Sequence, residues 1–377
     1  MIPESLRGRL ESWLLRVWFG PASALDRVLA ALASPLALPL SWLVAAVARR
    51  RRRSIVRQRA SEPGVPVVVV GNLVAGGSGK TPLVAAIDRS LAGQGFRPGL
   101  VTSGYRARGR DRPGAGAAAD GAAGNNAARG GVFLVDSGSD AAEVGDEALM
   151  LAIETGLPLA AGKDRALAVA QLCRAHPECD VIVSDDGLQH VGLVRRLELL
   201  VLDDRGLGNG RCLPAGPLRE PADRLDSVDA LIVTSERADA AHARVRRFRS
   251  SVQLQRFRML DGTQHWEPAD FAREFAGQRL SAIAGIARPQ RFFDSLEALG
   301  LAPQCYALPD HARIDPAWLA GLGGRWILMT SKDAVKCRRF DRVLLARCVS
   351  LDVAATPDPA LLKWLAAELR PVAHRNG

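Results

Sequence analysis

The stretch Val65–Pro82 constrains the fold of this chain more than any other. It opens with an uninterrupted β-branched run, Val67–Val70, which is typical of a strand buried on both faces. A glycine-rich loop follows and ends in Gly79-Lys80-Thr81, and a helical pattern begins at Pro82, where a proline suits the first turn. A strand, a glycine-rich loop, Lys-Thr and a helix together predict a phosphate-binding loop.

The residue types in this loop fit the chemistry of phosphate binding. Lys80 would supply a cation for terminal phosphates, and the Thr81 hydroxyl would face a magnesium ion. Backbone N–H groups would close around the phosphate oxygens, and we expect them to come from Gly76, Gly77, Ser78 and Gly79.

The loop departs from the usual pattern, G-x-x-x-x-G-K-[ST], because Val74 stands where a glycine is expected. Ala75 likewise stands where the deviant loop of MinD-like ATPases has a second lysine. The alternative is an ordinary glycine-rich turn. The agreement of strand, loop and helix favours the phosphate-binding loop.

Composition bounds the partners of the chain. Its 377 residues predict two or three domains, and its net charge is +10. A dense basic cluster, Arg49–Arg53, directly follows an apolar run, which favours an anionic membrane surface over nucleic acid. An aromatic content of 5% is low for base stacking. No segment indicates an obligate protein partner.

The apolar run before this cluster predicts a membrane anchor. Val28–Ala48 is long enough to span a bilayer, although it contains Pro35 and Pro39. The preceding segment, Ser12–Leu25, mixes tryptophans with arginines as an interfacial helix does. The run could span the membrane or lie flat on it, and the alternative to both is a buried helical hairpin broken at the prolines.

Residues 60–245 alternate between predicted strands and helices, which indicates a mostly parallel α/β sheet with helices on both faces. The segment Gly109–Gly131, rich in Gly, Ala and Asn, indicates a surface insertion. The predicted strands are Val67–Val70, Gly99–Thr102, Val132–Val135, Val181–Ser184, Glu198–Leu202 and Ala230–Thr234.

Two carboxylates, Asp185 and Asp186, follow one of these strands at the edge where open α/β sheets bind ligands. An aspartate there, with a phosphate-binding loop upstream, matches the Walker B arrangement that holds magnesium. Two adjacent carboxylates are costly to bury unless a metal or lysine compensates them. The alternative is a polar turn after a strand.

Other candidates are weaker from the residues alone. Asp146 and Glu147 open a predicted helix, where carboxylates commonly complement the helix dipole. Arg219 and Glu220 lie in a proline-rich loop of the kind that often carries function, and Gly206–Gly210 before it indicates special backbone.

The last third of the chain predicts a smaller α/β domain after an arginine-rich connector, Ala240–Arg258. Its predicted elements are a strand (Leu280–Gly285), a helix (Gln290–Leu299) and a strand (Trp326–Thr330). His311 is a lone loop histidine, for which a surface role is the default. Thr330-Ser-Lys-Asp333 has the wrong register for a guanine-reading motif, so GTP is not supported. The predicted domains are residues 1–60, 61–245 and 246–377.

Seven motifs in this order resemble those of the tetraacyldisaccharide 4′-kinases, the lipid A 4′-kinases of Gram-negative bacteria. The resemblance covers nearly the whole chain. It rests on Val70–Pro82, Val144–Glu147, Asp185–His190, Gly208–Pro221, Pro289–Phe293, Pro309–His311 and Leu328–Cys337.

The resemblance implies a P-loop kinase domain, a smaller C-terminal domain and an N-terminal helix at the cytoplasmic face of the inner membrane. The implied reaction moves the γ-phosphate of ATP, with Mg²⁺, to the 4′-hydroxyl of a tetraacylated glucosamine disaccharide 1-phosphate. It makes Asp146 the general base, assisted by His311, with Lys80 also catalytic. This replaces the dipole interpretation of Asp146.

The resemblance also assigns binding roles. It implies a nucleotide site at the phosphate-binding loop with Asp186, Gln189 and His190. Metal ligands would be Thr81, Asp185 and Glu147, and substrate contacts would be Tyr105, Arg219 and Glu220.

The chain departs from the family pattern at Ser103, Ala312 and Ser331, and the 109–131 insertion is unusual. These departures concern substrate contacts. Two rival functions follow from the residues: a membrane-associated P-loop ATPase that drives partner binding, which the absence of a lysine at Ala75 disfavours, and a nucleic-acid-binding protein, which would show salt-dependent DNA affinity.

Overall fold

The computed structural model describes residues 4–20, 22–57, 64–77, 79–104, 131–235 and 244–370. The chain divides into two units and passes between them four times. Unit 1 comprises Met1–Lys80, Asp186–Ser250 and Asp358–Gly377, and unit 2 comprises Thr81–Asp185 and Ser251–Pro357. The predicted domain division stays a prediction.

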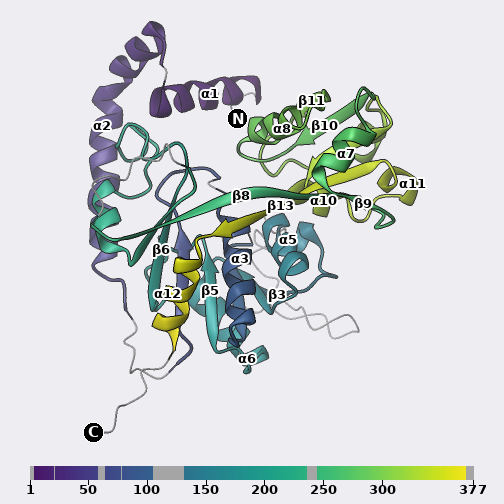
Figure 1. Cartoon of the computed structure of the whole chain (residues 1–377). Helices are drawn as coiled ribbons and strands as arrows, with labels where there is room; N and C mark the ends of the chain where they lie inside the picture. The colour runs from purple at the N-terminus through teal and green to yellow at the C-terminus, as the bar shows by residue number, and fades with distance from the viewer. Residues whose placement is uncertain are drawn as a thin grey trace, which may run out of the picture. The chain divides into compact units, whose positions relative to one another are not determined.

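Unit 1 begins with two helices, α1 (Glu4–Phe19) and α2 (Ala24–Arg52), drawn in purple in Figure 1. Ser23 and Asp26 form a capping box at the start of α2, and Arg16 of α1 binds the same aspartate through two hydrogen bonds of 3.0 Å. The pair therefore fixes the turn between the helices.

Helix α2 is continuous through Pro35 and Pro39, so the hairpin broken at the prolines is wrong. Each proline removes only its own N–H from the helix, and the remaining bonds carry the helix past it. The Ser34 hydroxyl donates to the carbonyl of Ala31 at 2.7 Å. Among the described residues α2 is the one helix long and apolar enough to cross a membrane.

The sheet of unit 1 is parallel, with strand order β8-β7-β6-β1. The apolar run of the phosphate-binding stretch forms β1, which is buried throughout and pairs Val68 with Leu197 of β6. The closing helix α12 (Pro359–Leu369) stacks Trp364 on Phe248 of β8. The strands are β1 (Val67–Gly71), β6 (Leu197–Leu202), β7 (Ala230–Val233) and β8 (Arg246–Met259), which continues into unit 2.

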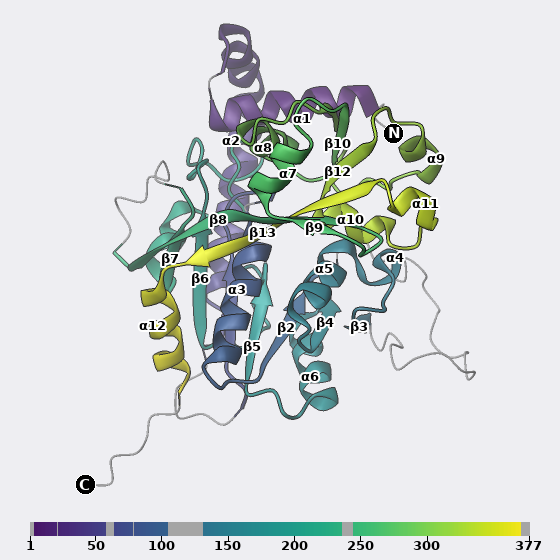
Figure 2. The ribbon, with the colours of Figure 1, turned by 45° about the vertical axis from the view of Figure 1, so that its right-hand side comes forward.

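Unit 2 contains the strands β5-β2-β4-β3, which are parallel except for the antiparallel edge strand β3. Figure 2 shows α5 and α6 lying along these strands. The elements are β2 (Pro98–Thr102), β3 (Val132–Val135), β4 (Leu159–Gly162), β5 (Val181–Asp185), α3 (Lys80–Gly93), α4 (Ala141–Val144), α5 (Asp146–Thr155) and α6 (Arg165–Ala175).

The rest of unit 2 is a second layered region, with strand order β11-β10-β12-β13-β8 and β9 beside β8. Its core is aromatic: the rings of Phe257 and Phe271 stack with centroids 3.9 Å apart, and Trp266 packs edge-on against Phe271. The elements are β9 (His265–Trp266), β10 (Leu280–Ala284), β11 (Gln304–Ala307), β12 (Trp326–Thr330), β13 (Cys348–Pro357), α7 (Pro268–Glu274), α8 (Pro289–Ala298), α9 (Pro316–Ala320), α10 (Ser331–Cys337) and α11 (Arg342–Leu345).

The predicted α/β class and mostly parallel strands are confirmed, and the predicted strand ends agree within a residue. The connector predicted at Ala240–Arg258 is wrong where β8 begins at Arg246. Phe248 and Phe257 in this segment are each less exposed than the arginines on either side of them, and most side chains of the segment are exposed. Alternation of more and less exposed side chains is typical of a strand.

A buried carboxylate lies near the start of β6, an interior strand of the unit 1 sheet. Glu198 on β6 is 2% exposed and accepts hydrogen bonds from Arg195 at 3.0 Å and from Arg224 of the short 3₁₀ helix Ala222–Ser227. Both arginines are essentially buried, and Arg57 adds an ion pair at 3.2 Å. Each buried charge in this group therefore depends on the others.

We expect Glu198→Gln to lower the free energy of unfolding by about 3–5 kcal/mol, because it leaves two buried arginines without their carboxylate. Urea denaturation followed by circular dichroism measures the change. The matched control is Asp270→Asn, which breaks an exposed ion pair with Arg273 and should cost at most about 1 kcal/mol. Equal midpoints for Glu198→Gln and wild type would contradict the assignment.

Candidate active site

The phosphate-binding loop follows β1 directly. Lys80 begins α3, and its ammonium group donates to Asn72 Oδ1 at 2.9 Å. Asn72 is itself buried and donates to the carbonyl of Val74 at 2.9 Å. Gly76 and Gly79 have positive φ values of 91° and 69°, a backbone region that favours glycine. The hydrogen bonds of Asn72 and the glycine conformations thus hold the loop backbone and Lys80 in place.

Asp186 connects Lys80 to Arg219. Its carboxylate lies 3.1 Å from Lys80 Nζ and accepts from Arg219 Nη1 at 3.0 Å. Burial would raise the pKa of Asp186, but the charges of Lys80 and Arg219 outweigh it and hold the pKa well below its usual range. The residue has φ 51°, so its backbone is strained to point the carboxylate at both cations.

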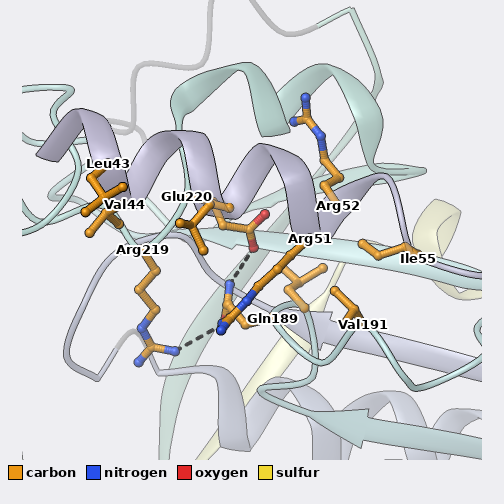
Figure 3. A pocket seen from close by; sticks show the side chains of 12 residues that line it. Leu43, Val44, Arg51, Arg52, Ile55, Gln189, Val191, Arg219 and Glu220 are labelled. Atoms are coloured by element: carbon orange, nitrogen blue, oxygen red, sulfur yellow. Dashed lines mark hydrogen bonds between the residues drawn. The ribbon is translucent and has the colours of Figure 1, made fainter.

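Gln189 continues this network toward Glu220. Its amide nitrogen donates to Glu220 Oε1 at 2.9 Å and to the carbonyl of Asn72 at 3.3 Å, and Arg219 donates to its oxygen at 3.4 Å. Figure 3 shows Arg219 and Glu220 on opposite sides of Gln189, with both hydrogen bonds dashed. Gln189 thus connects the phosphate-binding loop to Arg219 and Glu220 through hydrogen bonds.

The same three side chains line a pocket of about 340 Å³ against α2 (Figure 3). The helix contributes an apolar wall with Leu43, Val44 and Val47, and arginines at one end. The pocket therefore has an apolar wall from α2 on one side and the polar side chains of Gln189, Arg219 and Glu220 on the other.

The second cluster lies in unit 2 and centres on Asp146, at the N-terminus of α5. His311 Nδ1 is 2.9 Å from Asp146 Oδ1 and 3.0 Å from Oδ2. His311 has φ 59°, and Gly145 before the carboxylate has φ 94°. Both sharp backbone turns serve to bring these two side chains, far apart in the sequence, into one hydrogen-bonded pair.

Lys332 on α10 defines the protonation of this pair. Its ammonium nitrogen is 3.2 Å from His311 Nε2, and an ammonium group can only donate. Nε2 therefore accepts, and the proton of a neutral imidazole lies on Nδ1, where it is donated to Asp146. Lys332 also donates to Glu147 at 2.9 Å and to Asp310 at 3.1 Å.

The surrounding charges keep Asp146 ionised. Burial raises the pKa of Asp146, but the hydrogen bond from His311 and the charges of Lys332 and Lys336 outweigh it and lower the pKa below its usual value. Burial correspondingly lowers the pKa of Lys332, and the carboxylates of Glu147 and Asp310 more than reverse this. The cluster thus presents a carboxylate as a proton acceptor near neutral pH.

Oxygen donors suited to magnesium adjoin Lys80 and Asp186 in the sequence. Thr81 is in the first turn of α3, and Asp185 ends β5 with 3% exposure. Both carboxylate oxygens of Asp88 on α3 are buried without a hydrogen-bond partner in the described structure, and burial followed by the charge of Asp185 raises the pKa of Asp88. Oxygen ligands in this environment fit a hard divalent cation.

Among the described residues no group of three or more His, Cys, Asp or Glu side chains forms a ready-made metal site. Magnesium beside nucleotides is commonly held by one or two protein oxygens together with phosphates and water. The donor set fits that binding mode.

The structure brings most predicted site residues into the two clusters. Ser78 and Tyr105 lie outside the described residues. Glu147, predicted as a metal ligand, is paired with Lys332, and the described contacts of His190 include its carbonyl, which accepts from Arg195. These individual roles stay predictions.

Sequence reasoning missed Asn72 and three charged residues of the second cluster. Lys332 and Lys336 are four residues apart on α10, which places both on one face toward α5. That spacing was the available signal, and both lysines lie within the Leu328–Cys337 motif of the resemblance, to which no residue role was assigned. Asp310 lies within the Pro309–His311 motif.

Comparisons with known proteins agree over almost the whole chain. The LpxK family profile, described as Tetraacyldisaccharide-1-P 4'-kinase, matches residues 33–370. A tetraacyldisaccharide 4'-kinase from Bordetella petrii is 40% identical over 92% of this chain and 94% of its own length, and one from Azoarcus sp. is 45% identical over 81% and 84%.

Among solved structures, LpxK from Aquifex aeolicus, crystallised in complex with ATP, superposes with a TM-score of 0.69. It is 23% identical, covers 90% of this chain and is itself covered completely, and this likeness concerns the fold. The profile match and the curated relatives together establish that the chain belongs to the tetraacyldisaccharide-1-P 4'-kinase family.

Proposed function

We propose that this enzyme transfers the γ-phosphate of ATP to the 4′-hydroxyl of a tetraacylated disaccharide 1-phosphate at the cytoplasmic face of the inner membrane. The product belongs to lipid A biosynthesis. The observation that carries the proposal is the ionised, buried Asp146 held by His311, in a chain of this family that also has a phosphate-binding loop.

On the nucleotide side, Lys80 binds the terminal phosphates of ATP. Phosphoryl transfer needs little covalent chemistry from a protein, so positioned cations supply much of the catalysis. Asn72 and Asp186 hold Lys80 in place before the nucleotide arrives, and Arg219 neutralises the aspartate that would otherwise compete with phosphate. Loop N–H groups, including those of Gly76, Gly77 and Gly79, complete the phosphate contacts.

On the acceptor side, Asp146 takes the proton of the 4′-hydroxyl as the hydroxyl oxygen attacks the γ-phosphorus, and the bond from that phosphorus to the β,γ-bridging oxygen breaks to release ADP. His311 donates its Nδ1 proton to the same carboxylate and fixes the orientation of the base. Lys332 holds the imidazole in the required tautomer. Asp146 is thus the base, and His311 holds its carboxylate in the orientation needed to accept the proton.

Thr81 and Asp185 are the residues that would hold Mg²⁺, with Asp186 nearby in sequence. When bound, the ion would neutralise negative charge on the phosphates of ATP. Glu147 would join them only by exchanging its ion pair with Lys332.

The lipid acceptor would meet the enzyme at α2. The apolar wall of the pocket suits an acyl chain, and Arg219 and Glu220 offer polar groups to a sugar. Most large apolar side chains of α2 are exposed, among them Leu32, Leu36 and Trp42. An exposed apolar helix ending in arginines suits an enzyme whose acceptor stays in a bilayer.

The reaction is tested with γ-labelled ATP and the tetraacyldisaccharide 1-phosphate in detergent micelles. Label in the lipid supports the proposal. ATP hydrolysis that is independent of the lipid, with none labelled, would contradict it and favour an ATPase.

Asp146→Asn should lower transfer by about 10²–10⁴-fold, the usual contribution of a general base, while leaving affinity for an ATP analogue near that of wild type. The same micelle assay and calorimetric titration measure the two quantities. Lys80→Ala is the contrasting variant, since it should weaken analogue binding as well. An Asp146→Asn enzyme that keeps more than about a tenth of the rate would refute the base assignment.

The pH dependence should change when His311 is removed. The base must be unprotonated, so activity is lost as pH falls through the pKa of Asp146. In wild type this acid limb lies below the usual aspartate range, because the lowering contacts prevail over burial. In His311→Ala burial remains while the strongest lowering contact is gone, so the acid limb of kcat/KM should move to higher pH. If the acid limb of His311→Ala stays at the wild-type pH, His311 does not lower the pKa of Asp146.

Membrane binding should depend on the exposed arginines that end α2. Arg50, Arg51 and Arg53 are exposed, whereas Arg49 and Arg52 pair with Asp223. Replacing the three exposed arginines with glutamine should weaken binding to phosphatidylglycerol vesicles by about 1 kcal/mol per residue. Vesicle sedimentation measures the loss. Neutral phosphatidylcholine vesicles are the control, and an equal loss on both would contradict an electrostatic contribution.

A further inference from the structure

The connection after β6, residues 203–221, contains the glycine-rich stretch that the proposed reaction does not use. Gly206, Gly208 and Gly210 have φ values of 55°, 58° and 73°. Their N–H groups close successive turns onto the carbonyls of Asp203, Arg205 and Leu207. The stretch is therefore a defined series of turns with a particular backbone path.

This path fits closely against the end of α1. A Cβ atom on Gly208 would lie 2.7 Å from the carbonyl oxygen of Trp18 and 3.1 Å from Phe19 Cδ1. Contacts this short exclude a side chain at position 208. Trp18 Nε1 also donates to the carbonyl of Pro214 at 3.3 Å. The connection and α1 thus form one packed surface within unit 1.

The connection also holds the first part of the phosphate-binding loop. Leu218 forms a bridge with Val74, and the N–H of Ala75 donates to the carbonyl of Pro217 at 2.8 Å. The N–H of Arg219 donates to the carbonyl of Leu73 at 2.7 Å. One edge of the loop is therefore fixed by backbone hydrogen bonds.

Arg205 makes the corresponding contact to the glycine part of the loop. Its Nη2 donates to the carbonyl of Gly77 at 2.8 Å, and the same nitrogen donates to Asp203 at 2.7 Å. Its Nε makes further bonds to Asp203, which is 2% exposed. The planar guanidinium is therefore fixed in orientation before it reaches the loop.

The guanidinium also contacts α1. Its carbon lies 5.3 Å from the centroid of the Phe19 ring, in cation–π range. One side chain thus touches the N-terminal helix pair and a backbone carbonyl of the phosphate-binding loop.

We propose that Arg205 is a positioning residue that couples α1 to the phosphate-binding loop, so that the order of the loop depends on how α1 is seated. Part of this rests on the proposed function, because the loop is taken to bind ATP. A rigid loop loses less entropy when phosphate binds, so seating of α1 increases nucleotide affinity. A movement of α1 at a membrane surface would change the contact of Phe19 with Arg205 and, through it, the hydrogen bond to Gly77.

Hydrogen–deuterium exchange tests the coupling without nucleotide. Arg205→Ala and Phe19→Leu, in the full chain in detergent, should both speed amide exchange in the peptide covering residues 71–83. Leu15→Ala, at an exposed position of α1, and Arg273→Ala, in an exposed pair of unit 2, should leave that peptide unchanged. Unchanged exchange in either Arg205→Ala or Phe19→Leu would overturn the proposal.

Nucleotide titration gives the second readout. Arg205→Ala should raise the Kd of a non-hydrolysable ATP analogue by about tenfold, equivalent to about 1.4 kcal/mol. Phe19→Leu should raise it by about threefold, and the double variant should show less than the product of the two effects, because both act on one contact. The KM for the lipid acceptor should stay unchanged.

Arg205→Lys separates positioning from stability. It keeps the charge but not the fork, so it should fold with a Tm near that of wild type and still show weaker analogue binding. Parallel rises in both KM values with a lowered Tm would indicate a general structural role and overturn the proposal. Wild-type protein that binds no adenine nucleotide would instead refute the proposed function, and the exchange experiment would still decide the coupling.

Discussion

Unit 1 depends on the ion pairs that the buried carboxylate of Glu198 forms with buried arginines. This carboxylate compensates two buried arginines, and one of these, Arg224, also contacts Glu220 at 3.4 Å. From there polar contacts continue without interruption to the phosphate-binding loop, so the lysine that meets phosphate is held by the same network that stabilises the core. Such preorganisation means that little rearrangement is needed when charge develops in the reaction. The network runs from Glu198 through Arg224, Glu220, Gln189, Arg219 and Asp186 to Lys80.

Local features of the site were predictable because their causes are local. The β-branched run forms β1, and the glycines and Lys80 lie at the turn into α3. The conformation of each of these segments is determined by residues that are adjacent in the sequence. Gly145 and Asp146 open α5 for the same reason. The pairing of Asp146 with His311 spans 165 positions in the chain, and no periodicity reports it. Only the family resemblance connected the two residues.

The pairing of charged side chains from distant parts of the chain could not be predicted from the sequence. Lys332 makes sense only when Glu147, Asp310 and His311 surround it, and those neighbours come from separate elements. The arginine-rich strand β8 was taken for a connector because charge suggested solvent, although solvent-facing charge is compatible with a strand whose other face is covered. Short strands of small residues, such as β4, carry too little β-branched signal to be recognised without their neighbours.

The two prolines of α2 have a consequence for the depth at which that helix can lie. Pro35 has no N–H to offer the carbonyl of Ala31, and the hydroxyl of Ser34 supplies the missing donor instead. In water this substitution would matter little, since solvent would satisfy the carbonyl. In hydrocarbon an unsatisfied carbonyl costs several kcal/mol, so a single hydroxyl makes the proline-bearing turn compatible with lipid. Ser34 thus removes the polarity barrier that Pro35 would otherwise create at this turn of α2.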